Sequence, residues 1–288
     1  MKGPLKFAAV VAVVVSASLI LAPLLHDLVP YPFPRTFKRL LMIGAILAGL
    51  AFVRIRKDTV VRLGLNWTPD APRFLRTGLL TGLTTLALFA AVAVVTGHAE
   101  AAIRERTGLQ WLQRIGGGLL TGILIGFLEE VLFRGFVFTY VRDRILRSRV
   151  FPAMVVTSLV YASLHFLDVR TPAVSPDPGI ADGVRLILAP FRSLADWPTL
   201  WPAAVGLFLF GMILNVCVVR TGSLYPSIGL HAGTVTFLRV SGLFLKFGES
   251  DTLIWGSKRV YDGVLGWVFL LIIGALLVLF LRRSGSAP

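Results

Sequence analysis

The chain has a single cysteine, Cys217, among its 288 residues, and this excludes an intrachain disulfide and a zinc site built from several thiolates. Cys217 lies in an apolar stretch, so we expect it to be a packing residue rather than a nucleophile. Long polar stretches are also missing. The longest weakly apolar intervals cover about residues 54–76 and 168–202. Both are too short to fold around a core of their own, so no separate soluble domain is predicted.

Apolar residues make up 56% of the chain, far more than a soluble domain contains. Stretches of about 20 mostly apolar residues, the length that crosses a bilayer as a helix, recur throughout. We therefore predict an all-α, polytopic membrane helical bundle of about eight transmembrane helices. Their clearest apolar runs are 7–25, 40–53, 79–95, 119–140, 151–166, 203–219, 224–240 and 264–281.

The first of these runs has two interpretations. Lys2 and Lys6 precede it and Val15-Ser16-Ala17 resembles a cleavage site, as in a signal peptide. The run continues beyond the usual length of a signal peptide, however, so we expect a retained span.

Acidic residues are scarce, with 15 Asp and Glu against 29 Lys and Arg, and the formal net charge is +14. The basic residues are shared among the loops instead of forming one patch, so we predict no nucleic-acid partner. Lys and Arg concentrate in cytoplasmic loops of membrane proteins, which favours both termini in the cytoplasm. The densest basic groups are Arg54, Arg56, Lys57 and Arg62 after the second span, and Arg142, Arg144, Arg147 and Arg149 after the fourth.

The interval 168–202 begins as a Pro-rich loop and continues into a mixed apolar and polar segment from Ile180 to Leu194. We expect an interfacial helix that breaks at Pro190. A surface connector is favoured there over a lid or a substrate guide. The sequence has no inverted repeat of the kind that marks many transporters.

Adjacent acids, Glu129 and Glu130, lie inside an apolar stretch and are followed by Arg134. Each charge near the middle of a membrane costs roughly 3 kcal/mol on insertion scales, so three in one span indicate chemistry, ion transport or a buried network. On a helix, Glu130 and Arg134 share a face, while Glu129 points about 100° away from Glu130. One carboxylate can be neutralised while its neighbour stays free. Gly122 and Gly126 precede the pair at a spacing that allows another helix to approach closely.

Two of the four histidines, His165 and His231, fall within or at the ends of apolar spans. With the carboxylate pair they predict a shared polar site. A carboxylate and two imidazoles suit hydrolysis, because a base must take a proton from water while a donor stabilises the oxyanion. Glu129, His165 and His231 would also be the ligands if zinc were used. The chain has neither His-Glu-x-x-His nor Gly-x-Ser-x-Gly, which removes the commonest zinc-protease and serine-hydrolase patterns.

These residues resemble the CPBP family of intramembrane proteases, the type II CAAX prenyl endopeptidase, Rce1-like or Abi group. Glu129, Glu130 and Arg134 match its Glu-Glu-x-x-x-Arg motif. Tyr161 and His165 approximate Phe-x-x-x-His, and His231 begins His-x-x-x-Asn/Asp, whose last position is Val235 here. The resemblance covers about residues 118–236. It divides one integrated membrane domain into N-terminal helices (1–110), a CPBP catalytic core (111–240) and a C-terminal helix (241–288).

The resemblance implies a glutamic-type endopeptidase. Glu129 would be the general base, helped by His165, and His231 would stabilise the oxyanion. Glu130 and Arg134 would hold the base electrostatically. We expect no cofactor, with zinc as the less favoured alternative. Losing an oxyanion donor typically costs about 10²–10³ in rate, so Val235 raises the question of what replaces the family's polar residue.

Candidates for possible oxyanion donation or support are Asn215, Thr234 and Tyr161. Thr234 points to a different helix face from His231, and Asn215 reaches the site only if its span packs against the next one. For Asn215 an interhelical hydrogen bond is the favoured interpretation.

Three functions remain open at this point. The first is an endopeptidase that cuts a membrane-anchored protein or peptide in a bacterial inner membrane. The second is a catalytically silent membrane protein of the same fold that binds or regulates a partner, which Val235 keeps open. The third, a transporter, is disfavoured by the missing repeat. The expected partners are membrane lipids and that membrane-anchored substrate.

Overall fold

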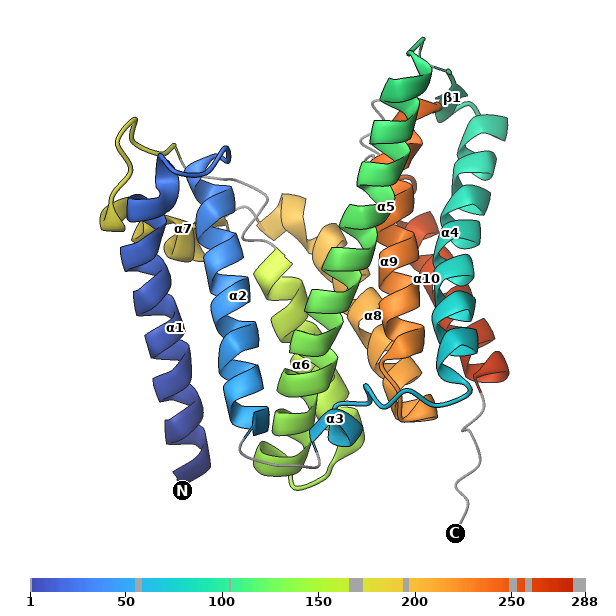
Figure 1. Ribbon diagram of the computed structural model, residues 1–288. Coiled ribbons are helices and arrows are strands. Elements are labelled where there is room, and N and C mark those ends of the chain that lie inside the picture. Colours follow the sequence, from blue (N-terminus) through green and yellow to red (C-terminus); the bar gives the residue numbers. More distant parts are fainter. Residues whose placement is uncertain are drawn as a thin grey trace.

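The computed structural model describes residues 2–54, 59–103, 105–165, 173–193, 197–248, 253–256 and 261–281. The chain folds as an all-α polytopic bundle, as predicted, with long helices that run side by side (Figure 1). Arg56 and Lys57, used above for topology, and Phe166, the predicted end of the fifth span, lie outside the described residues. The described helices of the bundle are α1 (Lys2–His26), α2 (Phe33–Arg54), α3 (Thr59–Arg62), α4 (Ala71–Val95), α5 (Gly108–Glu130), α6 (Val150–His165), α7 (Ile180–Ser193), α8 (Trp197–Thr221), α9 (Tyr225–Val240) and α10 (Val264–Phe280).

Every one of the eight predicted spans falls on a helix. Among the described residues, four helical segments are long and apolar enough to cross a membrane: Ala8–His26, Ala71–Val95, Gly108–Ile145 and Leu200–Thr221. Two more, α6 and α10, are apolar but shorter. The protein is therefore an integral membrane protein. In Figure 1, α1 begins and α10 ends on the same side of the bundle.

The span Gly108–Ile145 is one continuous helical segment with a change of winding inside it. It is α-helical through Glu130 and then takes the wider π-helical form in η1 (Val131–Phe138) and again in η2 (Val141–Ile145). Local π-helical turns are uncommon and occur often at functional sites. The change begins directly after the two adjacent carboxylates.

Helix α9 lies between α4 and α5, and glycines on these helices bring the backbones close together. A Cβ added at Gly126 of α5 would lie 2.8 Å from the backbone nitrogen of Ala232 in α9. Gly78 of α4 likewise faces the backbone of Pro226. Small residues at such spacing let membrane helices approach closely. The sequence prediction for Gly126 is therefore confirmed, and α9 is held firmly in place beside the carboxylates.

Helix α7 lies across one end of α1 and α2 (Figure 1). Its Leu186 is buried against Phe33 and Phe37 of α2. The helix predicted in this interval is present, but the predicted break at Pro190 is wrong, because α7 continues to Ser193. A turn anchored by the Asp182 carboxylate, which accepts from the backbone N–H groups of Ser175 and Gly179, fixes its start.

A short antiparallel pair of strands, β1 (Ala99–Ala101) and β2 (Leu245–Phe247), joins the ends of α4 and α5 to the end of α9. A single 3-10 turn, η5 (Ser241–Leu243), leads from α9 into β2. With three residues each, these strands are too short for an alternating pattern to predict them. They tie together the same three helices that the glycines pack.

Candidate active site

The two adjacent carboxylates end α5 and have opposite environments. Glu130 is fully buried, whereas the Glu129 side chain is 21% exposed. This is the division that their 100° separation on a helix predicts. One acid is part of the interior and the other is reachable from outside.

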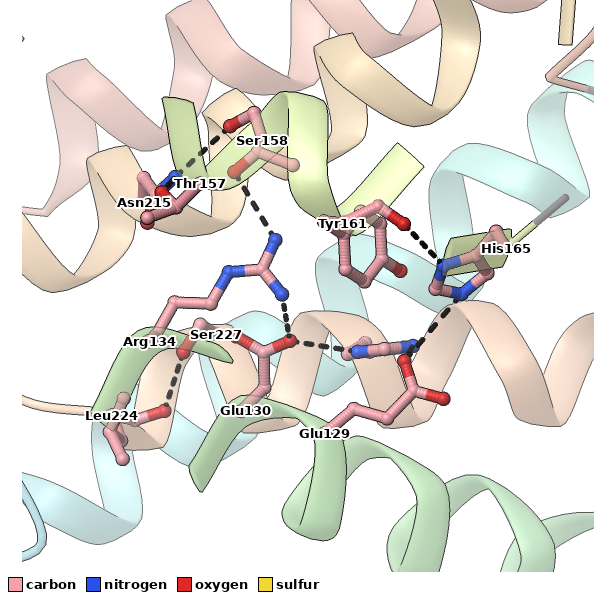
Figure 2. Close-up of polar contacts among 12 residues, drawn as sticks. Glu129, Glu130, Arg134, Thr157, Ser158, Tyr161, His165, Asn215, Leu224 and Ser227 are labelled. Carbon is pink, nitrogen blue, oxygen red and sulfur yellow. Dashed lines mark hydrogen bonds and ion pairs between the residues drawn. The ribbon is translucent and has the colours of Figure 1, made fainter. Parts of the chain in front are cut away.

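Glu130 belongs to a buried charged network (Figure 2). Its Oε1 accepts a hydrogen bond from Nη1 of Arg134 at 2.9 Å and another from Nδ1 of His231 at 2.9 Å. Arg134 also donates from Nη2 to the carbonyl oxygen of Gly211 in α8 at 3.3 Å, and its guanidinium lies 4.4 Å from the ring centroid of Tyr161. A buried ion pair persists only when it is well hydrogen-bonded, and this one is. It links α5, η1, α8 and α9.

Glu129 faces two imidazoles. Its Oε2 lies 3.6 Å from Nε2 of His165 and 3.8 Å from Nε2 of His231. Both distances exceed that of a direct hydrogen bond. The oxygen has no hydrogen-bond partner among the described residues. Oε2 of Glu129 and the two Nε2 atoms can each accept a proton. They lie close together without being hydrogen-bonded to one another.

The other ring nitrogens fix the histidine tautomers. Nδ1 of His165 lies 2.9 Å from the carbonyl oxygen of Tyr161, and Nδ1 of His231 lies 2.9 Å from Glu130. A carbonyl oxygen and an ionised carboxylate only accept, so each Nδ1 carries a proton. In the neutral form of either ring, the Nε2 that faces Glu129 then holds a lone pair. Each Nε2 can take up a proton, and becomes a donor only as an imidazolium.

Asn215 and Thr234, two of the three candidates for oxyanion donation, have other partners. The Asn215 amide nitrogen lies 3.0 Å from Oγ of Ser158 and 3.2 Å from Oγ1 of Thr157, so it ties α8 to α6 (Figure 2). Thr234 donates to the carbonyl oxygen of Leu230 at 2.9 Å and faces Gly82 of α4. Neither side chain is directed to Glu129. Tyr161, in contrast, lies among the side chains of the site, with its ring centroid 4.2 Å from that of His165.

Sequence reasoning missed Gly211. Its contribution is a backbone carbonyl, which any residue supplies, so no residue type could have identified it. It also did not foresee that His231 is shared between the two acids, through Nδ1 to Glu130 and Nε2 toward Glu129. Figure 2 shows Glu129, Glu130 and His165 in the same part of the site.

Glu129, His165 and His231 carry the donor types of a two-histidine, one-carboxylate metal site. In the part of the chain that the structure describes, however, no group of three His, Cys, Asp or Glu side chains has the arrangement of a metal site.

The fold and the site define a class: integral membrane proteins with a buried glutamate–arginine pair and two histidines facing a second, accessible glutamate. Residues 110–237 match the model of the family described as "Type II CAAX prenyl endopeptidase Rce1-like". This match supports the CPBP family assignment that the motifs predicted, and with it a CAAX-protease-type intramembrane fold. The matched segment contains all the residues of the site. Searches of curated proteins and of solved structures gave no match.

Proposed function

We propose that the protein is an intramembrane endopeptidase that hydrolyses a peptide bond of a membrane-anchored protein or peptide. The proposal rests on one observation. The partly exposed Glu129 side chain lies 3.6 Å from Nε2 of His165 and 3.8 Å from Nε2 of His231, and it is directly hydrogen-bonded to neither. Its buried neighbour Glu130 is occupied by Arg134 and His231. A general base needs a lone pair that no other group occupies, and Oε2 of Glu129 accepts no hydrogen bond from the described residues.

The reaction begins when Glu129 takes a proton from a water molecule whose oxygen attacks the scissile carbonyl carbon. The carbonyl π pair moves to its oxygen, giving a tetrahedral oxyanion. When the oxyanion collapses, the carbon–nitrogen bond breaks and Glu129 returns its proton to the leaving amine. His165 orients the water through Nε2. His231 stabilises the oxyanion as an imidazolium, and Glu130 stabilises that cation through Nδ1.

The buried Arg134 has a positioning role in this scheme. It binds the same oxygen of Glu130 that His231 contacts, and thereby fixes the carboxylate that orients His231. Its second hydrogen bond, to Gly211, attaches the network to α8. The reaction geometry thus rests on helices rather than on loops, which favours precision.

A second candidate function is a catalytically silent CPBP-fold protein that binds a partner. The observation that favours it is Val235, one helical turn after His231 and partly buried, where it supplies no hydrogen-bond donor. We place either function in a bacterial inner membrane with both termini cytoplasmic.

A comparison of Glu129→Gln with the wild type separates the two functions. Peptides released from or retained in membranes of cells that express each form would be quantified by mass spectrometry. The endopeptidase proposal predicts cleaved peptides that disappear in Glu129→Gln. The matched control is Glu100→Gln, since Glu100 is 74% exposed on β1 and far from the site in the fold. Identical peptide sets in all three samples would refute the endopeptidase.

A further inference from the structure

Tyr161 has a polar group that the scheme above does not use. The residue is 1% exposed, and its ring packs against Phe133 at 5.2 Å, the guanidinium of Arg134 at 4.4 Å and the imidazole of His165 at 4.2 Å. Its hydroxyl makes no hydrogen bond with the described residues, and its oxygen is not among the fully buried polar atoms that lack a partner. Buried tyrosines usually satisfy this group, and leaving it unpaired destabilises the fold. A tyrosine hydroxyl that meets no partner within an otherwise buried residue therefore needs an explanation.

The position of the hydroxyl suggests what that explanation is. In Figure 2 the Tyr161 ring lies between Arg134 and His165, and its hydroxyl is on the side of Glu129 and His165. The hydroxyl is thus directed toward the side of the site where Glu129 and His165 lie, rather than toward the buried ion pair.

The donors around Glu129 are few. In the neutral rings Nε2 of His165 and of His231 accept only, because the proton is on Nδ1, and His231 donates to the oxyanion only in its imidazolium form. The amide of Asn215 is hydrogen-bonded to Ser158 of α6, and the hydroxyl of Thr234 donates to the carbonyl oxygen of Leu230. Among His165, His231, Asn215, Thr234 and Tyr161, only Tyr161 has a donor that is both uncharged and not already hydrogen-bonded to another described residue.

We propose that Tyr161 is a catalytic residue whose O–H donates a hydrogen bond to the tetrahedral oxyanion. The inference rests on the proposed endopeptidase function and names a donor that Val235 does not supply. The hydroxyl keeps its proton throughout: it binds the oxygen when water adds to the carbonyl, and it is released when the carbon–nitrogen bond breaks and the carbonyl re-forms. A donor held in place before the reaction needs no reorganisation at the transition state.

The test is Tyr161→Phe, which removes only the oxygen and keeps the ring contacts with Arg134 and His165. The probe is a synthetic form of the peptide whose cleavage in cells depends most strongly on Glu129, assayed with the purified full chain in lipid nanodiscs. We expect kcat to fall by about 10²–10³ with little change in KM, as for the loss of one oxyanion donor. Thermal unfolding should occur at the same or a higher temperature, because the hydroxyl loses no partner.

The matched control is Tyr225→Phe. In the wild type the Tyr225 hydroxyl lies outside the site and donates to the carbonyl oxygen of Leu65 at 3.0 Å. The control should unfold no higher than the wild type and keep its kcat. A Tyr161→Phe kcat within threefold of the wild type overturns the inference, as does a lower unfolding temperature, which would show that the hydroxyl has a structural partner. If Glu129→Gln cleaves as the wild type does, the proposed function itself fails, and the two failures are distinct.

Discussion

Replacing Arg134 by methionine tests the buried network in isolation. Methionine keeps much of the length and the apolar stem, but it removes the ion pair with Glu130, the hydrogen bond to Gly211 and the stacking on Tyr161. Glu130, with no exposed surface, keeps His231 as its hydrogen-bonding partner. Removing one partner of a buried ion pair typically destabilises a protein by about 3–5 kcal/mol, and we expect a loss of that size.

The double variant Glu130→Gln/Arg134→Met shows whether the loss comes from the stranded charge. Glutamine keeps an oxygen that accepts from His231, while the unpaired carboxylate is gone. Replacing both partners of a buried pair by neutral groups is often nearly neutral, so we expect the double variant to regain most of the stability lost in Arg134→Met. The free energy of unfolding would be measured in mixed micelles for the wild type, both single variants and the double variant. A loss below about 1 kcal/mol in Arg134→Met would refute the reasoning.

Three further predictions address other parts of the fold. Gly126→Ala should destabilise the protein by about 1–3 kcal/mol, because its Cβ would lie 2.8 Å from the Ala232 backbone, whereas Gly116→Ala, with nothing within 4 Å, should not; comparable unfolding of both variants would contradict the packing of α5 on α9. The backbone N–H of Gly179, with that of Ser175 and with Arg185, holds the pKa of Asp182 below its usual range. The ionised Asp182 therefore stabilises the fold above the pKa that it has in the unfolded chain, and this stabilisation is lost as pH falls through the lower folded pKa. Protection factors for hydrogen exchange at the start of α7, corrected for the intrinsic pH dependence of exchange, should therefore fall in acid in the wild type, and Asp182→Asn should show low protection already at neutral pH; equal protection factors at both pH values in the wild type would argue against this anchor. Val235→Asn should leave activity equal to or above that of the wild type, because an added donor one turn after His231 suits an oxyanion, and a sharp fall in kcat on the same Glu129-dependent peptide would show a differently built site.

Local periodicity predicted the parts of the site that lie on one helix. The i,i+4 pairing of Glu130 with Arg134 and the separate direction of Glu129 follow from 3.6 residues per turn, and the structure shows both. The close approach at Gly126 follows from the missing side chain. The expected gathering of both histidines beside the carboxylates is likewise present in the structure.

The parts that sequence reasoning missed depend on how distant segments pack. Which acid His231 contacts through which nitrogen is decided by the closeness of α9 to α5, and the Gly211 contact uses a backbone atom. The π-helical form after Glu130 has no pattern in the sequence that we can identify. Pro190 did not end α7 as expected, since the helix continues three residues further. The strands β1 and β2 are too short to show alternation.

The most direct test of the account is the turnover of the purified protein with and without the Glu129 carboxylate, on a peptide found in the cellular comparison. General base catalysis contributes typically about 10²–10⁴ in rate, so Glu129→Gln should lose kcat by that factor while KM and the unfolding temperature stay near those of the wild type. Cleavage by Glu129→Gln at the wild-type rate would contradict the central claim that this carboxylate activates the attacking water.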